Sequence, residues 1–327
     1  MCVFVRVGQV NFVRSVVLVL CAALAVSADS LTLATWNMSG PDPLSDREQE
    51  IRSFGEFARS ADAIVLTEAL GKDQVERLLK TAALGDWNFA VSDFSSDSLN
   101  NPFLRLEVAV ISPHELGAKT EVDPYPRDDT AEMRVRDLDI NVPAFIPDDQ
   151  RSTTGARGWF LVEIPSLKLA VAAVHLKSSR GQSGHNDEKN SFKREAVAAA
   201  LGVAILDSVR SRNDWSYVVA GDFNVAPGDV GKVGVDLKHR CAEQEPACTR
   251  YDQTHALLSG GLVEGLAMRN LTVGIGATYA HSDFTQGPID NILATGPLLD
   301  GRGKVTAVRG GAFGSDHHAV RVTITSK

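Results

Sequence analysis

The sequence predicts an α/β protein in which a few helices cover the outside of two face-to-face β-sheets. The 327 residues have an ordinary globular composition, with 44% hydrophobic and 23% charged residues. Apolar runs of strand length outnumber segments with helical periodicity, and the helical segments are interspersed among them. Several of these runs are apolar almost throughout, which is typical of strands buried on both faces. Two packed sheets under outer helices satisfy this order of elements.

Ten strands are expected from short apolar runs that end at polar or turn-forming residues. They span residues 31–36, 63–68, 87–91, 107–112, 159–164, 169–176, 217–222, 289–294, 304–308 and 319–325. Residues 113–157 are rich in Asp, Arg and Pro and predict no element. A loop beside a catalytic face is one interpretation, and a surface excursion is the favoured one.

Three helices are expected between these strands. The first follows a capping box, Ser45-Asp-Arg-Glu48, in which the serine caps the helix and the glutamate lies three residues on. Its apolar residues recur at helical spacing: Ile51, Phe54, Phe57 and Ala58. The second helix covers residues 73–82, and its inward residues are Val75, Leu78 and Leu79. The third covers residues 187–209.

The first 28 residues have the pattern of a secretory signal peptide. Arg6 and Arg14 precede the apolar run 16–26, which is short for a transmembrane helix, and cleavage is expected after Ala28. An uncleaved membrane anchor is the alternative. The sequence contains no linker or repeat, so residues 29–327 are expected to form a single catalytic domain that is secreted or periplasmic.

Two cysteines remain after removal of this segment. Cys241 and Cys248 are separated by six residues in a region rich in Glu, Gln and Pro. In an exported protein such a pair is expected to form a disulfide, and two free thiols are the alternative. A zinc site is disfavoured because the nearest histidines lack metal-binding spacing.

The charge balance limits the kinds of partner. Without the two arginines of the signal segment, 31 basic residues face 41 acidic ones, a formal net charge of −10. Such a chain does not attract a polyanion from a distance. A phosphate ester would therefore have to be bound by local basic residues and a cation.

Polar residues recur where apolar strands begin or end. They are Asn37, Glu68, His175, Asp222, Asn224, Asp290 and the run Ser315-Asp316-His317. Each has an ordinary interpretation alone: a turn residue, a cap, half of an ion pair or a hydrogen-bonded core histidine. Charged groups on buried strands are costly unless they are paired or bound to metal, so their joint occurrence predicts one site.

Five motifs carry a resemblance to a known family. They are Thr35-Trp-Asn37, Leu66-Thr-Glu68, Val174-His-Leu176, Gly221-Asp-Phe-Asn224, and Ile289-Asp290 with Ser315-Asp-His317. In these motifs the chain resembles the endonuclease/exonuclease/phosphatase superfamily. That superfamily includes DNase I, repair nucleases, neutral sphingomyelinases and inositol-polyphosphate 5-phosphatases. The resemblance implies a four-layered α-β-β-α sandwich with two packed mixed sheets.

The resemblance also implies a metal site. Glu68 would be the main metal-ligating carboxylate with Asn37 beside it, and Asp316 would help to hold a second metal. Mg²⁺ is the expected ion because it prefers oxygen ligands, with Mn²⁺ or Ca²⁺ as alternatives. Thr67 stands where the family usually has Gln, a change expected to be harmless because Thr67 points away from Glu68 on a strand.

The catalytic residues are implied in the same way. Asp222 and Asn224 would orient the attacking water and the phosphate, and on an extended backbone both would face the same side. Asp290 would orient His317, and His175 would be a second catalytic histidine. The division of acid and base roles between the two histidines stays open.

Basic residues near these motifs are candidates for phosphate contact. Arg157 corresponds loosely to a phosphate-contacting arginine of some members, and a surface arginine is the equal alternative. Lys177 could line a substrate groove. Lys193 and Arg194 are more simply explained as the solvated face of the third helix.

The sequence therefore predicts a secreted, metal-dependent phosphodiesterase with nucleic acid as its substrate. A sphingomyelinase-like or inositol-phosphate phosphatase acting on phospholipid headgroups is the alternative, ranked lower because no apolar membrane-facing loop is evident. A non-enzymatic binding module is the third hypothesis, disfavoured because the principal site residues are present. No stable protein partner is inferred.

Overall fold

The structure is a computed structural model, and it describes eleven stretches of the chain. They are residues 30–39, 44–93, 107–122, 157–178, 180–181, 184–185, 188–227, 252–259, 263–280, 287–300 and 303–325. The predicted signal segment, Cys241 and Cys248 lie outside these residues, as does most of 113–157. Within the described part, no helix combines the length and the apolar character needed to cross a membrane.

The first sheet has six strands in the order β13-β14-β1-β2-β4-β3. Their bounds are β1 Ser30–Asn37, β2 Ala63–Ala69, β3 Asn88–Val91, β4 Glu107–Ser112, β13 Lys304–Arg309 and β14 Val320–Thr325. β1 and β2 are parallel and the other neighbours are antiparallel, so the sheet is mixed.

The second sheet also has six strands, in the order β11-β12-β10-β7-β6-β5. Their bounds are β5 Lys119–Val122, β6 Trp159–Ile164, β7 Leu169–His175, β10 Ser216–Asp222, β11 Arg269–Asn270 and β12 Asp290–Thr295. Only β7 and β10 are parallel. A separate two-stranded ribbon joins β8 Arg180–Gly181 to β9 Gly184–His185.

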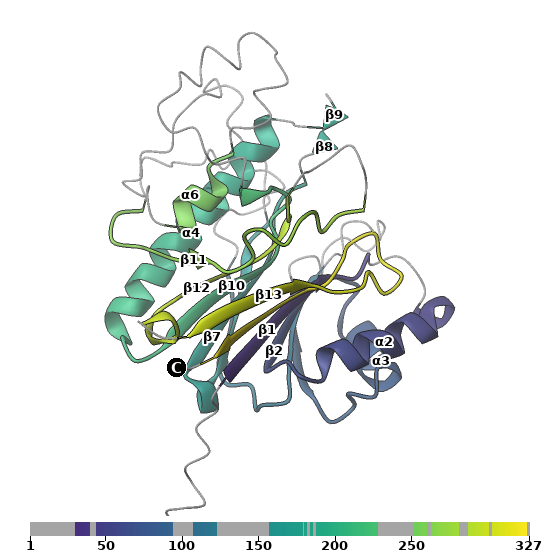
Figure 1. Cartoon of the computed structure of the whole chain (residues 1–327). Coiled ribbons are helices and arrows are strands. Elements are labelled where there is room, and N and C mark those ends of the chain that lie inside the picture. Colours follow the sequence, from purple (N-terminus) through teal and green to yellow (C-terminus); the bar gives the residue numbers. More distant parts are fainter. Residues whose placement is uncertain are drawn as a thin grey trace, which may run out of the picture.

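The helices form the outer layers (Figure 1). Those of the described residues are α2 Glu48–Ala58, α3 Lys72–Thr81, α4 Glu188–Ser211 and α6 Thr254–Leu258, with short 3₁₀ turns at Leu44–Arg47, Pro165–Leu167 and Pro297–Leu299. Figure 1 shows α2 and α3 on one side of the paired sheets and α4 and α6 on the other. The predicted four-layered α-β-β-α sandwich is therefore confirmed.

Three apolar layers hold these four layers together, because each sheet is buried on both faces. Residues such as Val65, Val171 and Val322 fill the space between the sheets. Trp36 and Leu66 lie under α2 and α3. The outer face of β7 and β10 lies under α4 and α6, and this third layer includes Val174, Val219, Val197, Leu201 and Leu257.

Several local predictions need correction. α2 begins later than the capping box predicted: residues 44–47 form a 3₁₀ turn, the helix begins at Glu48, and its N-cap residue is Arg47, which makes no side-chain cap. β5 lies inside the stretch for which no element was predicted, at the edge of its sheet, where its side chains are mostly exposed. β11 and α6 were missed because two and five residues are too short for a periodic pattern.

Candidate active site

The strand register brings the predicted site residues to one end of the sandwich. β1 and β2 run parallel in one sheet and β7 and β10 in the other, so each pair ends on the same side. Asp222 lies opposite His175 on one side and Asp290 on the other. β14 runs antiparallel to β1, with Val320 opposite Thr35, so His317 lies just beyond the end of β1.

Asn37 connects the two sheets at this end. Its side chain is fully buried, and its Nδ2 donates hydrogen bonds to Oε1 of Glu68 at 3.0 Å and to Oδ2 of Asp222 at 3.1 Å. Its Oδ1 accepts the backbone N–H of Ser39 at 2.9 Å. Nε2 of His175 lies 3.6 Å from the same Glu68 oxygen and 3.7 Å from the same Asp222 oxygen. Two carboxylates and one imidazole thus converge around a single amide.

Glu68 does not lie on regular strand backbone. The pairing of β2 with β4 shifts between Thr67 and Ala69, and Glu68 adopts a left-handed backbone with φ of 58°. A bulge of this kind redirects one side chain out of the sheet's alternation. The expectation that Thr67 and Glu68 alternate on an unbroken strand is therefore wrong, although the Thr67 side chain is buried.

Asp222 and Asn224 are arranged differently from the prediction. β10 ends at Asp222, and Asn224 has a φ of 54°, so the backbone between them is not extended and the shared-face argument is wrong. Oδ1 of Asp222 instead accepts the N–H of Asn224 at 2.8 Å, and Nδ2 of Asn224 donates to the carbonyl of Leu176 at 3.0 Å. The Asn224 side chain therefore ties the end of β10 to the end of β7.

Gly221 permits the close approach of these two strands. Its φ is 141°, and a Cβ at this position would lie 1.9 Å from the carbonyl oxygen of Val174. Only glycine satisfies both conditions without a shift of the backbone. The glycine before Asp222 is thus required by the packing of β10 against β7.

Asp290 and His317 form the second connection between the sheets. Oδ2 of Asp290 lies 2.9 Å from Nδ1 of His317, and both residues are buried. A carboxylate accepts, so Nδ1 carries a proton and Nε2 is directed toward Asp222, whose Oδ2 is 4.0 Å away. The predicted alignment of His317 by Asp290 is present in the geometry.

Three residues that the sequence analysis did not assign hold this pair in place. Oγ of Ser315 donates to the carbonyl of Asn37 at 2.8 Å and accepts the N–H of His317 at 3.0 Å. Oγ1 of Thr278, fully buried, accepts the N–H of Asp290 at 3.1 Å. The ring of Tyr279 lies 4.8 Å from the His317 ring, and the two residues form an isolated β-bridge. No sequence motif distinguished Thr278 or Tyr279.

Burial and neighbouring charges separate the protonation states of these groups. Burial raises the pKa of Asp222 to about 7, against the opposing effect of the His317 charge. Burial lowers the pKa of His175 well below its usual range, and the charges of Arg157, His317 and Lys177 add to this. Burial would also lower the pKa of His317, but the charge and hydrogen bond of Asp290, together with the charges of Asp222 and Asp316, raise that pKa to about 10. At neutral pH the site holds a neutral His175 and a charged His317.

The remaining predicted residues lie at the rim. Arg157 is half-buried, and its Nη1 donates to the carbonyl of His175 at 3.3 Å. Lys177 is half-buried two residues after His175. Asp316 is exposed, near Oγ of Ser315 at 3.5 Å, and helps to raise the pKa of His317. Among the described residues, Asp316 belongs to neither group of clustered ligand atoms.

The donor atoms at Glu68 fit a divalent cation. Ligand atoms of Glu68, His175 and Asp222 lie within 4.8 Å of one another, and the Glu68 side chain keeps 22% of its surface exposed. Carboxylate oxygens with an open side suit Mg²⁺, which retains water ligands. Asn37 turns its amide nitrogen, not its oxygen, toward the carboxylates, so in this geometry it orients Glu68. The other group, Asp222 with Asp290 and His317, is wholly buried.

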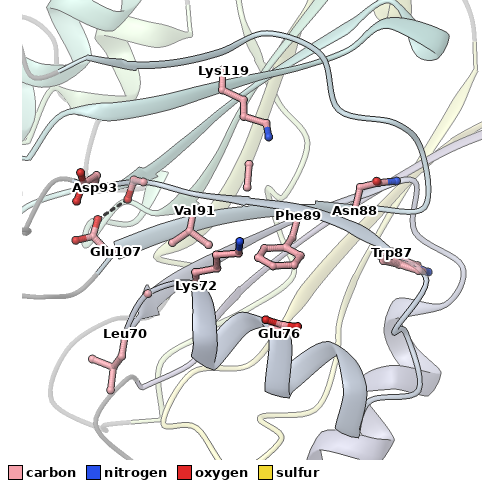
Figure 2. A pocket seen from close by; sticks show the side chains of 13 residues that line it. Leu70, Lys72, Glu76, Trp87, Asn88, Phe89, Val91, Asp93, Glu107 and Lys119 are labelled. Carbon is pink, nitrogen blue, oxygen red and sulfur yellow. Dashed lines mark hydrogen bonds between the residues drawn. The ribbon is translucent and has the colours of Figure 1, made fainter.

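A separate groove of about 880 Å³ opens beside the end of β2. Figure 2 shows it between α3, which carries Lys72 and Glu76, and the edge strand β3, with Lys119 of β5 across from them. Asp93 and Glu107 add negative charge at one end. The groove has mixed charge, and none of the predicted catalytic residues lines it.

Comparisons with known proteins identify the family and the fold. Residues 34–317 match the family described as the Endonuclease/Exonuclease/phosphatase family. A sequence search of curated proteins found no match. Truncated TDP2 from Caenorhabditis elegans superimposes with a TM-score of 0.56 at 13% identity, covering 91% of this chain and 98% of the other.

Two nucleases show the same likeness. The 3′-5′ exonuclease NExo from Neisseria meningitidis gives a TM-score of 0.53 at 16% identity, covering 90% of this chain and 100% of the other. An AP endonuclease from Archaeoglobus fulgidus gives 0.51 at 15% identity, covering 90% and 99%. At such identities the likeness establishes the fold.

Proposed function

The chain belongs to the Endonuclease/Exonuclease/phosphatase family, and we propose that it is a phosphodiesterase that hydrolyses nucleic acid with the help of a divalent cation. The observation that carries this proposal is the convergence of Asn37, Glu68, His175, Asp222, Asp290 and His317 at one end of both sheets. The family supports a hydrolase of phosphoric esters, and the arrangement supplies the groups that such a hydrolysis needs.

Asp222 is suited to be the general base. A base works best when its pKa lies near the working pH, and burial raises the pKa of this carboxyl to about 7. As the oxygen of the attacking water bonds to phosphorus, its proton passes to Asp222. The bond from phosphorus to the leaving oxygen breaks, and that oxygen takes its proton from solvent.

His317 is suited to stabilise the negative charge of the phosphate. Its imidazolium is held by Asp290, and the Nε2–H is directed into the site, so it can donate to a phosphoryl oxygen without rearrangement. His175 is neutral and can only contribute a hydrogen bond. This assigns the charged role to His317 and makes His175 a poor proton donor to the leaving group.

The ion would be held by Glu68, whose carboxylate Asn37 orients. When bound, a divalent cation neutralises the phosphoryl oxygens and the charge that develops on the leaving oxygen. Mg²⁺ is the proposed ion, with Mn²⁺ or Ca²⁺ as alternatives, and a second ion at Asp316 stays a prediction. Arg157 and Lys177 lie close enough to His175 to affect its pKa, which supports phosphate contact by both.

Nucleic acid is the proposed substrate because relatives in fold act on it. NExo from Neisseria is described as a 3′ phosphatase bound to a product DNA hairpin, and the Archaeoglobus protein as an AP endonuclease. Nothing in the described residues favours a phospholipid headgroup, which remains an outcome of the test.

The test is hydrolysis by the purified chain from residue 29 onward, incubated with plasmid DNA, RNA and sphingomyelin vesicles, with Mg²⁺ or with EDTA. We expect cleavage of DNA or RNA that EDTA abolishes and that falls at least about 10²-fold in His317→Ala and Asp222→Ala. His114→Ala is the matched control, because His114 pairs with Asp62 at the opposite end of the first sheet. Wild-type activity in both site variants would refute the assignment, and turnover of sphingomyelin alone would replace the substrate.

Export of the protein, the single-domain organisation and the Cys241–Cys248 disulfide also stay proposals, supported by sequence pattern alone. N-terminal sequencing of the protein recovered from the periplasm or the medium tests the first. A chain that begins at Asp29 is expected, and an intact Met1 would overturn it.

A further inference from the structure

Two segments that follow strands of the second sheet lie next to residues of the candidate active site, and we call these segments the exits of β7 and β10. After His175 the chain leaves β7 through Lys177, and after Asp222 it leaves β10 through Val225. The carbonyls of Lys177 and Val225 lie beyond the last paired residues of these strands, and they need donors because buried backbone carbonyls are costly when unpaired. The side chains that supply these donors come from the helical layer behind the sheet.

Arg194 of α4 and His255 of α6 are those donors. Nη1 of Arg194 donates to the carbonyl of Lys177 at 2.7 Å, and Nε2 of His255 lies 3.1 Å from the carbonyl of Val225. The two side chains are only 3% and 2% exposed. The interpretation of Arg194 as part of a solvated helix face is therefore wrong. A buried donor from the helical layer thus contacts each exit.

The donors are themselves fixed. Nε and Nη2 of Arg194 both lie 2.7 Å from Oδ2 of Asp252, whose other oxygen accepts the N–H of Thr254 at 2.9 Å. The His255 ring stacks on Phe223 with 5.1 Å between the centroids and 11° between the planes. We call Arg194, Glu195, Asp252 and His255 the rear polar cluster.

The protonation of His255 suits its contact. A carbonyl only accepts, so Nε2 must carry the proton, and the neutral ring then has its lone pair on Nδ1. Burial lowers the pKa of His255 to about 4, although the Val225 carbonyl and Asp252 oppose this. The ring is therefore a fixed neutral donor at neutral pH.

The two exits are also joined to each other. The N–H of Leu176 donates to the backbone carbonyl of Asp222 at 2.9 Å, and the carbonyl of Leu176 accepts Nδ2 of Asn224 at 3.0 Å. A displacement of either exit is thus transmitted to Asp222, and to His175 immediately before Leu176.

Stability alone does not explain the rear polar cluster. Well-packed apolar residues in place of a buried ion pair are often as stable or more so. Burial and the neighbouring Asp252 raise the pKa of Glu195 well above its usual range. Oε2 of Glu195, Nδ1 of His255 and Oγ1 of Thr254 have no hydrogen-bond partner among the described residues. Such costs are typical of sites kept for function.

We propose that Arg194, Asp252 and His255 are positioning residues, which hold the exits of β7 and β10 so that His175 and Asp222 face the substrate. This inference rests on the proposed phosphodiesterase activity for its catalytic consequence. Its structural part, the restraint of the two exits, does not depend on which substrate the enzyme uses.

The experiment compares His255→Gln with His255→Leu in the full chain from residue 29. The glutamine amide can place a donor near the position of Nε2, whereas leucine fills the space without one. Readouts are kcat and KM on DNA with Mg²⁺, amide hydrogen exchange at Leu176 and Asn224, and urea unfolding. His114→Leu is the control histidine, and the Val162 amide in β6 is the control amide.

We expect His255→Leu to lower kcat by about tenfold to 10²-fold with little change in KM, because small misplacements of catalytic groups have effects of that size. Exchange at Leu176 and Asn224 should rise while Val162 stays protected. His255→Gln should have a kcat, and an amide exchange at Leu176 and Asn224, that are both close to those of the wild type. A purely structural role would instead lower the urea midpoint and leave the kcat of the folded protein unchanged.

Wild-type kcat and wild-type exchange in a folded His255→Leu chain would overturn the proposal. Should that variant not fold, Arg194→Lys replaces it, since a single ammonium group lacks the fork that reaches both Asp252 and Lys177, and the same outcomes apply. If the wild-type chain cleaves no phosphodiester, the proposed function fails, and amide exchange alone decides whether the cluster restrains the exits.

Discussion

The two halves of the candidate active site are supported in different ways. The first-sheet half, which comprises Asn37, Glu68 and the run from Ser315 to His317, rests on aromatic packing. The second-sheet half, which comprises His175, Asp222, Asn224 and Asp290, rests at its β7 and β10 exits on the buried polar groups of the rear polar cluster.

The aromatic support is compact. The Trp36 and Phe54 rings stack at 4.5 Å, and Phe313 meets Trp36 edge-on at 5.8 Å. Nε1 of Trp36 donates to the carbonyl of Ala312 at 3.2 Å. These contacts fix the loop that leads to Ser315 and His317. Apolar packing is mostly non-directional, so it secures the loop by filling space, with one directional bond.

The polar support is directional, because it consists of hydrogen bonds and an ion pair. The carbonyl of Lys177 accepts from Arg194 and the carbonyl of Val225 accepts from His255, and removal of either donor takes that hydrogen bond away from a buried carbonyl. Loss of the aromatic support of the first-sheet half should therefore appear mainly as lost stability. Loss of the polar support of the second-sheet half should appear mainly as lost catalytic rate.

The largest loss of activity is expected at the pair of Asp290 and His317, where the two halves of the site meet. Asp290→Asn keeps the shape of the side chain but removes the charge that holds the His317 imidazolium. We expect kcat/KM to fall about 10²- to 10³-fold, the usual cost of losing a preorganised donor to the transition state. The measurement is the pH dependence of kcat/KM on DNA with saturating Mg²⁺.

The Asp290→Asn variant should also shift the pH dependence of kcat/KM in one direction. Because Asp290 contributes most to raising the pKa of His317 to about 10 against the effect of burial, its loss should move the alkaline limb to lower pH. Asp300→Asn, at the exposed far end of the same segment, should change neither rate nor profile. An unshifted alkaline limb would mean that His317 is not the group that titrates there.

The next largest effect tests the aromatic support. Trp36→Ala should reduce the free energy of unfolding by about 3–5 kcal/mol, since it leaves a cavity in a fully buried layer. At temperatures where the variant stays folded, its kcat should remain within a few-fold of wild type. Urea unfolding and steady-state kinetics on one preparation check both statements.

Trp36→Phe is the matched control, because it keeps an aromatic ring and should lose less stability. If Trp36→Ala lost rate while keeping stability, the proposed division between the two halves would be wrong.

The two halves also differ in how much of their structure could be predicted from the sequence. Apolar periodicity identified the helix that carries Phe54, and apolar runs gave the bounds of Glu107–Ser112 and Trp159–Ile164 as the structure has them. The polar strand ends predicted that Asp222 and Asp290 would converge, because topology sends those ends to one side. These signals are local, so one sequence contains them.

The rear polar cluster has no local signal. Arg194 and Asp252 are 58 positions apart, and a basic residue on a helix has the same sequence pattern whether it is solvated or buried against a distant carboxylate. The left-handed backbone at Glu68 and Asn224 could not be predicted for a related reason. Non-glycine residues seldom adopt positive φ, and neither a glutamate nor an asparagine predicts it by its residue type alone.

The smallest expected effect concerns stability in acid. His255 has a folded-state pKa of about 4, below its usual value near 6.5, because burial disfavours its charged form. Between these two values the unfolded chain binds a proton that the folded chain does not. Stability should therefore fall as pH drops from 6.5 toward 4, by up to about 3 kcal/mol from this residue.

His255→Gln keeps the donor but removes this titration. Urea unfolding of both proteins at pH 7 and at pH 4.5 should show similar stabilities at neutral pH and a smaller loss in acid for the glutamine variant. His114→Gln is the control, since His114 is half-exposed and paired with Asp62. Equal acid losses in wild type and His255→Gln would mean that His255 takes up its proton in the folded state. The polar support of the second-sheet half would then be more open to water than its burial indicates.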